Sequence, residues 1–266
     1  MIELFFRYIK DSRNNFLIYA VITAVLTLWI IYVYPTIGRL KELDNLIETL
    51  PIFIQAMLGE EVLSYTAFEG FMAMEFYNTT LLWILAVFAS LSCANIISSD
   101  ISTKRIDILL ANPIKRYQII LARFFTFIVY LFLLQITAYI IIFLGVKFVK
   151  IETDLILPIK IIIATFPISL AIGSICLFLS CLINEHIKAV SLSLGLVLLF
   201  FFLNVILSLS EKMSFLKKFI IFNYFDASKI VKYNTIDLTD TAILLAVSAV
   251  FLTISIIYFN KKEIYV

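Results

Sequence analysis

The sequence predicts an all-α polytopic membrane protein with six transmembrane helices, and two observations lead to this prediction. Of the 266 residues, 62% are hydrophobic and only 15% are charged, and the mean hydropathy is +1.05. A soluble domain of this length would carry far more charge and could not bury so much apolar surface in one core. The chain also contains six apolar runs of about the 20 residues that are needed to cross a hydrocarbon core of about 30 Å.

The predicted spans cover residues of about 16–34, 79–97, 118–144, 159–183, 187–208 and 241–259. Only the tripeptide Asn184 to His186 separates the fourth span from the fifth, which predicts a tight helical hairpin. Pro167 lies inside the fourth span, where we expect a kink. The connections are too short for an independent unit, so residues 1–266 are expected to form a single transmembrane domain.

The distribution of Lys and Arg predicts cytoplasmic termini. Six spans place both termini on the same side, and with the N-terminus inside, the inner segments hold 11 of the 21 basic residues. The inner segments are much shorter than the outer ones, so their density of positive charge is higher, as the positive-inside rule requires. The segment 100–123 contributes most, with Lys104, Arg105, Lys115, Arg116 and Arg123. We therefore expect an N-in, C-in, multi-pass protein of the cell membrane.

The first 14 residues predict an interfacial helix. Phe5, Phe6 and Ile9 follow Ile2 at helical spacing, while Arg7 and Lys10 lie on the other side. That pattern is typical of an amphipathic helix lying in the membrane interface. No small-residue cleavage site follows it, which argues against a signal peptide. The alternative is a basic anchor that only fixes the orientation.

The two long outer segments differ in character. Residues 35–78 are acidic and are expected to form an outer loop with a short helix ending before Pro51. Residues 209–240 mix lysines with many aromatic residues, which predicts ordered structure at the outer interface.

The sequence lacks the residues that catalysis or cofactor binding would need. Its six glycines are isolated, so no loop can hold nucleotide phosphates, and no protease or hydrolase motif occurs. The single histidine, His186, makes a histidine-rich metal site untenable. Cys93, Cys176 and Cys181 lie in apolar runs and are interpreted as packing residues. We expect neither an enzyme nor a bound cofactor, and energy for any transport must come from another subunit or from the substrate gradient.

Small and neutral polar residues within the spans predict close helix packing. We expect their small faces to pack mainly within the chain, against the alternative of a second copy. Asn204 and Gln135 are interpreted as interhelical hydrogen-bonding residues. The small faces consist of Ala86, Ser90 and Ala94 in the second span, Ser169, Gly173, Cys176 and Ser180 in the fourth, and Ser191 and Gly195 in the fifth.

The stretch "DISTKRIDILLANPIKRYQIILARF", residues 100–124, is unusually ordered for a connection between spans. Asp100, Ser102 and Thr103 can each cap the start of a short helix, and Ile106, Leu109 and Leu110 would form its apolar stripe. Asn112-Pro113 is typical of the start of a new helix. Residues 100–112 are therefore read either as a docking helix joined directly to the third span or as a solvated, positively charged loop.

This stretch resembles the loop after the second span of ATP-binding-cassette (ABC) transporter permeases of the type 2 export class. Asp100 and Asp107 take the places of two family acids, "LLANPIKR" (109–116) matches the family core, and Arg123 takes the place of a trailing basic residue. The family usually has Gly-Thr where this chain has Lys104-Arg105. Upstream, "LPIFIQAMLGEE" and "FEGFMAMEF" are similar to the first outer loop of small permeases in the class.

The resemblance implies that the chain is a six-span permease subunit of an ABC exporter. It also implies a separate ATPase that carries ATP and Mg²⁺. It implies two ATPase copies, a second permease chain as homodimer or heterodimer, a prokaryotic source, and re-entrant or interfacial helices at 210–240 that help to close an outer gate. The elbow helix would contain Phe5, Phe6, Arg7, Ile9 and Lys10. The ATPase-docking coupling helix would contain Asp100, Thr103, Lys104, Arg105, Ile106, Asp107, Leu110, Asn112 and Pro113.

Two other classes of function remain open. A membrane scaffold or assembly subunit without a transported substrate has the same hydropathy, whereas a lipid-modifying enzyme is disfavoured by the missing catalytic residues. The aromatic, uncharged spans are compatible with lipids, hydrophobic drugs or peptides as substrates.

Overall fold

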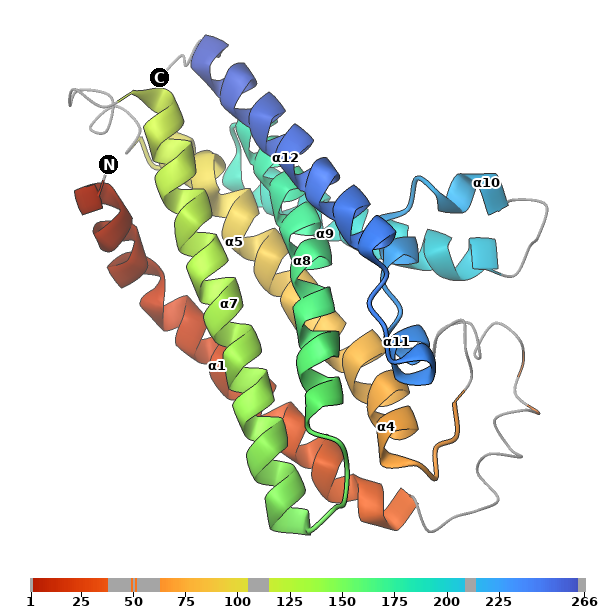
Figure 1. Ribbon diagram of the computed structural model, residues 1–266. Coiled ribbons are helices and arrows are strands. Elements are labelled where there is room, and N and C mark those ends of the chain that lie inside the picture. The colour runs from red at the N-terminus through yellow and green to blue at the C-terminus, as the bar shows by residue number, and fades with distance from the viewer. Residues whose placement is uncertain are drawn as a thin grey trace.

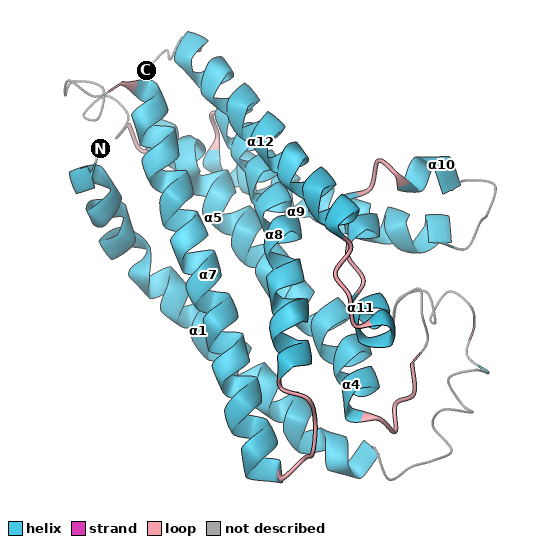
Figure 2. Cartoon of the chain, in the orientation of Figure 1, coloured by secondary structure: helices cyan, strands magenta, loops and turns pink. Residues whose placement is uncertain are grey.

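The computed structural model describes residues 2–37, 49, 51, 63–104, 115–208 and 214–262. In these ranges the secondary structure is helical and contains no strand (Figures 1 and 2). Six helical stretches among the described residues are long and apolar enough to cross a membrane, which confirms the predicted fold class. They cover Glu3–Ile37, Phe68–Ser102, Arg116–Val149, Ile156–Leu182, His186–Ser208 and Leu238–Lys261.

Helix α1 (Ile2–Ile37) is continuous and packs along α7 (Arg116–Val149). The residues expected in the elbow helix (1–14) and in the first span (16–34) form one uninterrupted helix. The sequence gives a physical reason, because α1 contains no glycine and its only proline, Pro35, lies in the last turn. An interfacial position for the first 14 residues stays a prediction.

The second span begins 11 residues earlier than predicted. Its helix starts with α4 (Phe68–Phe71), continues as the π-helical η1 (Met72–Leu81) and ends as α5 (Leu82–Ser102). Residues 68–78 were expected in the outer loop because they contain acidic side chains. Each of these carboxylates accepts a hydrogen bond from a hydroxyl group in the folded chain: Thr153 donates to Glu69 (2.6 Å) and Tyr65 donates to Glu75 (2.6 Å).

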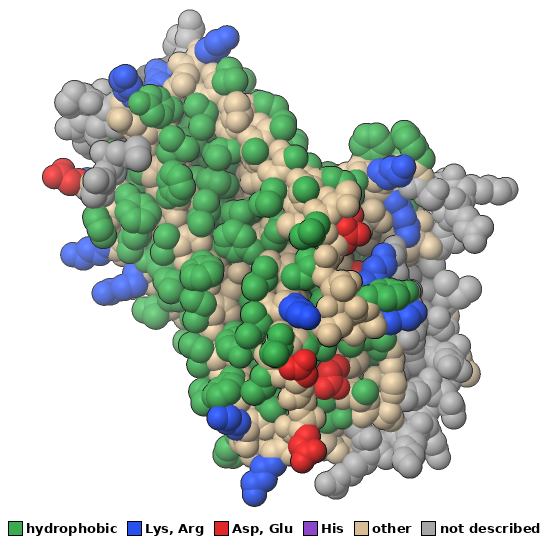
Figure 3. All heavy atoms as spheres, viewed as in Figure 1, with side chains coloured by type: hydrophobic (Ala, Val, Ile, Leu, Met, Phe, Trp, Pro, Cys, Tyr) green, Lys and Arg blue, Asp and Glu red, His purple; other side chains and the backbone are tan. Residues whose placement is uncertain are grey.

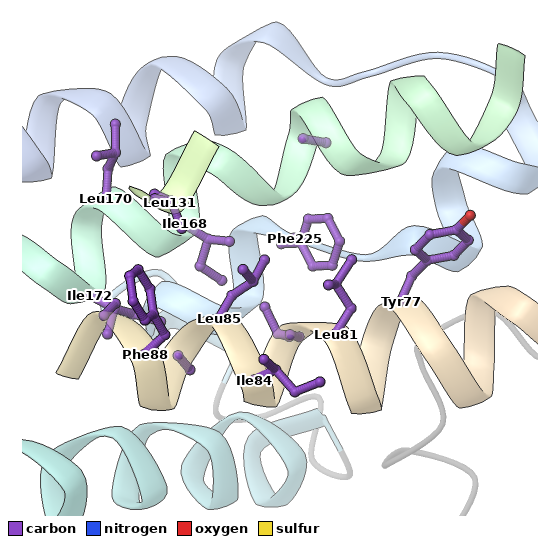
Figure 4. Packing of buried hydrophobic residues seen from close by; sticks show 14 of the residues in the cluster. Tyr77, Leu81, Ile84, Leu85, Phe88, Leu131, Ile168, Leu170, Ile172 and Phe225 are labelled. Atoms are coloured by element: carbon purple, nitrogen blue, oxygen red, sulfur yellow. The ribbon is translucent and has the colours of Figure 1, made fainter. Parts of the chain in front are cut away.

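Helix α8 (Ile156–Leu182) lies at the centre of the bundle, between α5 and α12 (Leu238–Lys261). Figure 4 shows Leu81, Leu85 and Phe88 of the second span projecting toward α8. The close approach of α8 to α7 depends on a small residue, since a Cβ on Gly173 would lie 2.6 Å from the Phe127 ring of α7. These faces therefore pack within the chain, as predicted, and α8 runs through Pro167 without ending.

The other predicted packing features have mixed outcomes. Residues 183–185 alone separate α8 from α9 (His186–Ser208), which confirms the helical hairpin. Gln135 donates to Thr165 of α8 (2.9 Å), which confirms its interhelical role. Among the described residues, the Asn204 Oδ1 atom has no hydrogen-bond partner. Ser191 and Gly195 are exposed on α9, and a Cβ on Gly195 would meet nothing within 4 Å, so this face does not pack within the chain.

The segment before the last span is folded onto the bundle, which confirms ordered structure in the described part of 209–240. It contains α10 (Ser214–Lys217), a 3₁₀ turn η3 (Ile221–Tyr224) and α11 (Ala227–Tyr233). Asn78 attaches this segment to the second span: its amide donates to Asp226 (3.0 Å) and Ser228 (3.0 Å), and its carbonyl accepts from the Ala227 N–H (2.7 Å).

Candidate functional site

The residues singled out in the sequence gather at one end of the bundle. The N-terminal turns of α1, the end of α5, the start of α7 and the end of α12 lie at this end, near the labelled termini in Figure 1. The connection between α5 and α7 includes residues 105–114, which are outside the described residues. The predicted contacts of Arg105, Ile106, Asp107, Leu110, Asn112 and Pro113 therefore stay predictions.

Asp100 is part of α5 and does not begin a new helix, so the predicted start of the docking helix at this residue is wrong. Its side chain is buried, and the residue is only 3% exposed. The Arg123 guanidinium of α7 donates to the Asp100 carboxylate and also to the backbone carbonyl of Ile96. The ion pair neutralises a carboxylate that burial alone would strongly disfavour, and it joins the second span to the third.

Thr103 and Lys104 complete the end of α5. The Thr103 hydroxyl donates back to the Ser99 carbonyl (2.7 Å), which satisfies a carbonyl of the last turn instead of capping a following helix. Lys104 then adopts a left-handed conformation, with φ of 56°, and its N–H donates to Ile101 (3.1 Å). This conformation favours glycine, the residue that the resembled family usually has here. Lys104 therefore retains the backbone turn without the glycine, and both side chains are exposed.

On the other side of residues 105–114, Arg116 begins α7 and connects it to α12. Its guanidinium donates to the carbonyls of Phe259 (3.2 Å) and Lys262. The Lys262 ammonium in turn donates to the carbonyls of Cys181 and Leu182, at the end of α8. Cations at helix C-termini satisfy carbonyls that have no partner within the helix. Partial burial lowers the pKa of Lys262 by desolvation. The start of α7, the end of α12 and the end of α8 are thus linked.

The N-terminal turns of α1 pack on α7 through a face that differs from the predicted one. Leu4 and Tyr8 are buried with Ala122, while Phe5 and Ile9 are half-buried. The predicted apolar face also included Phe6, which is 64% exposed. Amphipathic spacing alone did not reveal that Arg123 would hold the Tyr8 ring, with the guanidinium 4.4 Å from the ring centroid. Arg7 and Lys10 are exposed, as the interfacial interpretation requires.

A polar cavity of about 360 Å³ lies between these elements. It is lined from α1, α5, α7 and α9, and four lining residues have a buried polar atom without a hydrogen-bond partner in the described part of the chain: Tyr8 Oη, Asn95 Oδ1, Arg123 Nε and His186 Nδ1. A polar cavity of this size has room for water molecules that would satisfy these atoms. Sequence reasoning missed the cavity because its residues come from four separate helices, although Asn95 within an apolar span was a signal.

Among the described residues, no group of three His, Cys, Asp or Glu could hold a metal ion. The three cysteines are buried and free in the described structure, consistent with their interpretation as packing residues. The interactions found here are hydrogen bonds from arginine and lysine side chains, and they link the ends of neighbouring helices.

Comparison with known proteins identifies one family. A family model described as an ABC-2 family transporter protein matches residues 9–264, which is nearly the whole chain. A search of curated proteins gives no match.

Proposed function

The chain belongs to the ABC-2 family of transporter proteins, and on that premise we propose that it is the membrane-spanning subunit of an exporter driven by a separate ABC ATPase. ATP and Mg²⁺ bind to the ATPase, and this chain supplies the helices that rearrange. The segment 100–113 is the docking surface for the ATPase. Its described part offers Thr103 and Lys104 at the surface, while Asp100 acts from inside the bundle by holding Arg123.

One observation supports this function above the others: both flanks of residues 105–114 are fastened to neighbouring spans. On one flank, Asp100 of α5 binds Arg123 of α7. On the other flank, Arg116 binds the end of α12, whose Lys262 binds the end of α8. A force on the docking segment therefore reaches four spans through hydrogen bonds to charged groups, which are stronger than neutral ones. A solvated topology loop would need no such connections.

A second copy of the chain completes the proposed transporter. The α9 face that contains Ser191 and Gly195 is exposed, and small residues at a helix surface allow another helix to approach closely. The uncovered face supports this pairing. Homodimer and heterodimer are distinguished by co-expression of differently tagged copies of the chain.

The docking proposal is tested by co-purification. The chain is expressed with the ABC ATPase encoded beside it, and we expect the two to co-purify in detergent. Reversing two charges in the docking segment, with Arg105→Glu and Asp107→Lys, is expected to reduce ATPase recovery at least tenfold. The matched control reverses two charges at the opposite end of α7 and α8, with Lys150→Glu and Asp154→Lys, and should leave recovery unchanged.

Two results would contradict the proposal. If the reversed docking variant retains the ATPase at the control level, residues 105–107 do not contact it. If the ATPase binds but its hydrolysis rate is the same with and without the chain in nanodiscs, the alternative of a scaffold without transport is favoured.

A further inference from the structure

A groove of about 720 Å³ opens between the end of α8 and the last turns of α12, and it shares no lining residue with the polar cavity. It is lined by Leu182, Asn184, Ile254, Ile257, Tyr258, Lys261 and Lys262. Ile254, Ile257 and Lys261 follow helical spacing, so they share one face of α12. Neither the docking proposal nor the packing of the bundle gives this groove a role.

The groove is divided into an apolar part and a basic part. Ile254 and Ile257 are 41% and 51% exposed, and they lie deeper along the span than the two lysines. Lys261 and Lys262 stand at the rim with Asn184, and no acidic side chain is among the described lining residues. Figure 3 shows basic side chains at this end of the molecule, beyond a face covered by hydrophobic side chains.

We propose that this groove binds an anionic phospholipid, with the phosphate at Lys261 and Lys262 and an acyl chain along Ile254 and Ile257. Basic pockets at the ends of transmembrane helices attract anionic headgroups, and the apolar face below them matches a hydrocarbon chain. The two lysines at the rim disfavour a cationic ligand, and none of the described lining residues is acidic and able to pair with the amine of a zwitterionic headgroup.

Lys262 is well placed for this role because it belongs to the helix linkage as well. An ammonium group has three N–H donors, and Lys262 uses two of them toward the Cys181 and Leu182 carbonyls, which leaves one for a phosphate oxygen. The headgroup would therefore bridge α12 and the end of α8. Bound lipid is expected to stabilise the chain, since a ligand that binds only the folded state raises its unfolding temperature.

The proposal is tested with the full-length chain in nanodiscs or detergent, using dioleoyl phosphatidylglycerol and dioleoyl phosphatidylcholine as matched probes. Native mass spectrometry is expected to show retention of phosphatidylglycerol over phosphatidylcholine, and added phosphatidylglycerol should raise the unfolding temperature. Lys261→Gln should weaken phosphatidylglycerol binding about fivefold, the ratio that corresponds to about 1 kcal/mol for one lysine at an anionic surface. Lys147→Gln, near the other end of α7, is the control and should change nothing.

Lys261 is exposed, so its substitution tests the site even if Lys262→Gln disturbs the linkage to α8. Equal binding of the two lipids by the wild-type chain would overturn the proposal. So would an unchanged preference for phosphatidylglycerol in the Lys261→Gln variant, which would place the anionic lipid elsewhere on the molecule. Both readouts are independent of the ATPase, so failure of the docking proposal would leave this result interpretable.

Discussion

The Arg123 guanidinium in α7 is bound to the Asp100 carboxylate in α5, at the point where the second span leaves the bundle. The two side chains are only 18% and 4% exposed, so the pair is shielded from water. Removal of one partner leaves an uncompensated charge, whereas removal of both does not.

We therefore expect Arg123→Gln to destabilise the chain by about 3 kcal/mol and the double variant Arg123→Gln, Asp100→Asn to recover part of that loss. Thermal unfolding of the purified chain measures both effects. Lys188→Gln removes the surface pair with Glu185, whose side chains are 66% exposed, and should cost much less. Equal losses for the single and double variants would show that Asp100 is held by other groups.

Replacing Lys104 by glycine should stabilise the end of α5. Its φ of 56° costs a side-chain-bearing residue roughly 1 kcal/mol, which glycine does not incur. Lys104→Gly is expected to raise the free energy of unfolding by up to about 1 kcal/mol, while Lys104→Ala retains the unfavourable conformation and should not. Unfolding of both variants in denaturant or heat gives the comparison. A gain in the alanine variant equal to that in the glycine variant would assign the effect to the lost charge.

Asn78→Ala should loosen the segment before the last span. The substitution removes three hydrogen bonds and leaves the Ala227 N–H without its acceptor, at a cost of about 1–3 kcal/mol. We expect faster hydrogen exchange at the amides of α11, with little change at the opposite end of the bundle. Thr137→Ala, which removes an exposed hydroxyl on α7, is the control. Unchanged protection of α11 would mean that the apolar contacts of Phe225 and Ile230 hold it alone.

The start of α12 should depend on pH in the acid range. The backbone N–H groups of Thr239 and Asp240 donate to Asp237 and hold the pKa of its carboxyl below the usual value. Because the folded-state pKa is lower than the unfolded-state pKa, the cap stabilises fully above about pH 4 and weakens as the pH falls through the folded-state value. Asp237→Asn retains a capping side chain without titrating. Exchange of the first α12 amides should therefore rise in acid only in the wild-type chain.

Cysteine labelling tests the predicted orientation directly. The native Cys93, Cys176 and Cys181 are buried, so they should react slowly with a membrane-impermeant maleimide. In intact cells, Lys150→Cys should be labelled and Lys10→Cys should be protected, because these residues lie at opposite ends of the bundle. The reverse pattern would place both termini outside and would contradict docking of a cytoplasmic ATPase at residues 100–113.

Hydropathy sufficed for the spans because a membrane helix is selected by one property, its length in apolar residues. Hydropathy did not predict the helix at Phe68–Asn78, because the charged Glu69 and Glu75 are typical of a loop. Their partners, Thr153 and Tyr65, become visible only after folding. The same holds for the candidate site: the family-like pattern located the segment, but Arg123 pairs with Asp100 across 23 residues and Arg116 reaches α12 across more than 140. Such contacts depend on which helices become neighbours, and periodicity along one helix carries no information about that.

The length of α1 has a consequence for the membrane itself. Its 36 residues extend about 54 Å, whereas the hydrocarbon layer is about 30 Å thick. The apolar stretch of α1, at about 16–34, is close to that thickness, so the charged N-terminal turns extend beyond the hydrocarbon, and the tilt of the helix sets their position. Because the helix is continuous, pivoting it by 5° about its centre would displace each end by roughly 2 Å. Tyr8 and Ile9 lie near one end, against Arg123 and Tyr130. A change in the tilt of α1 is thereby converted into a shift of the wall of the polar cavity.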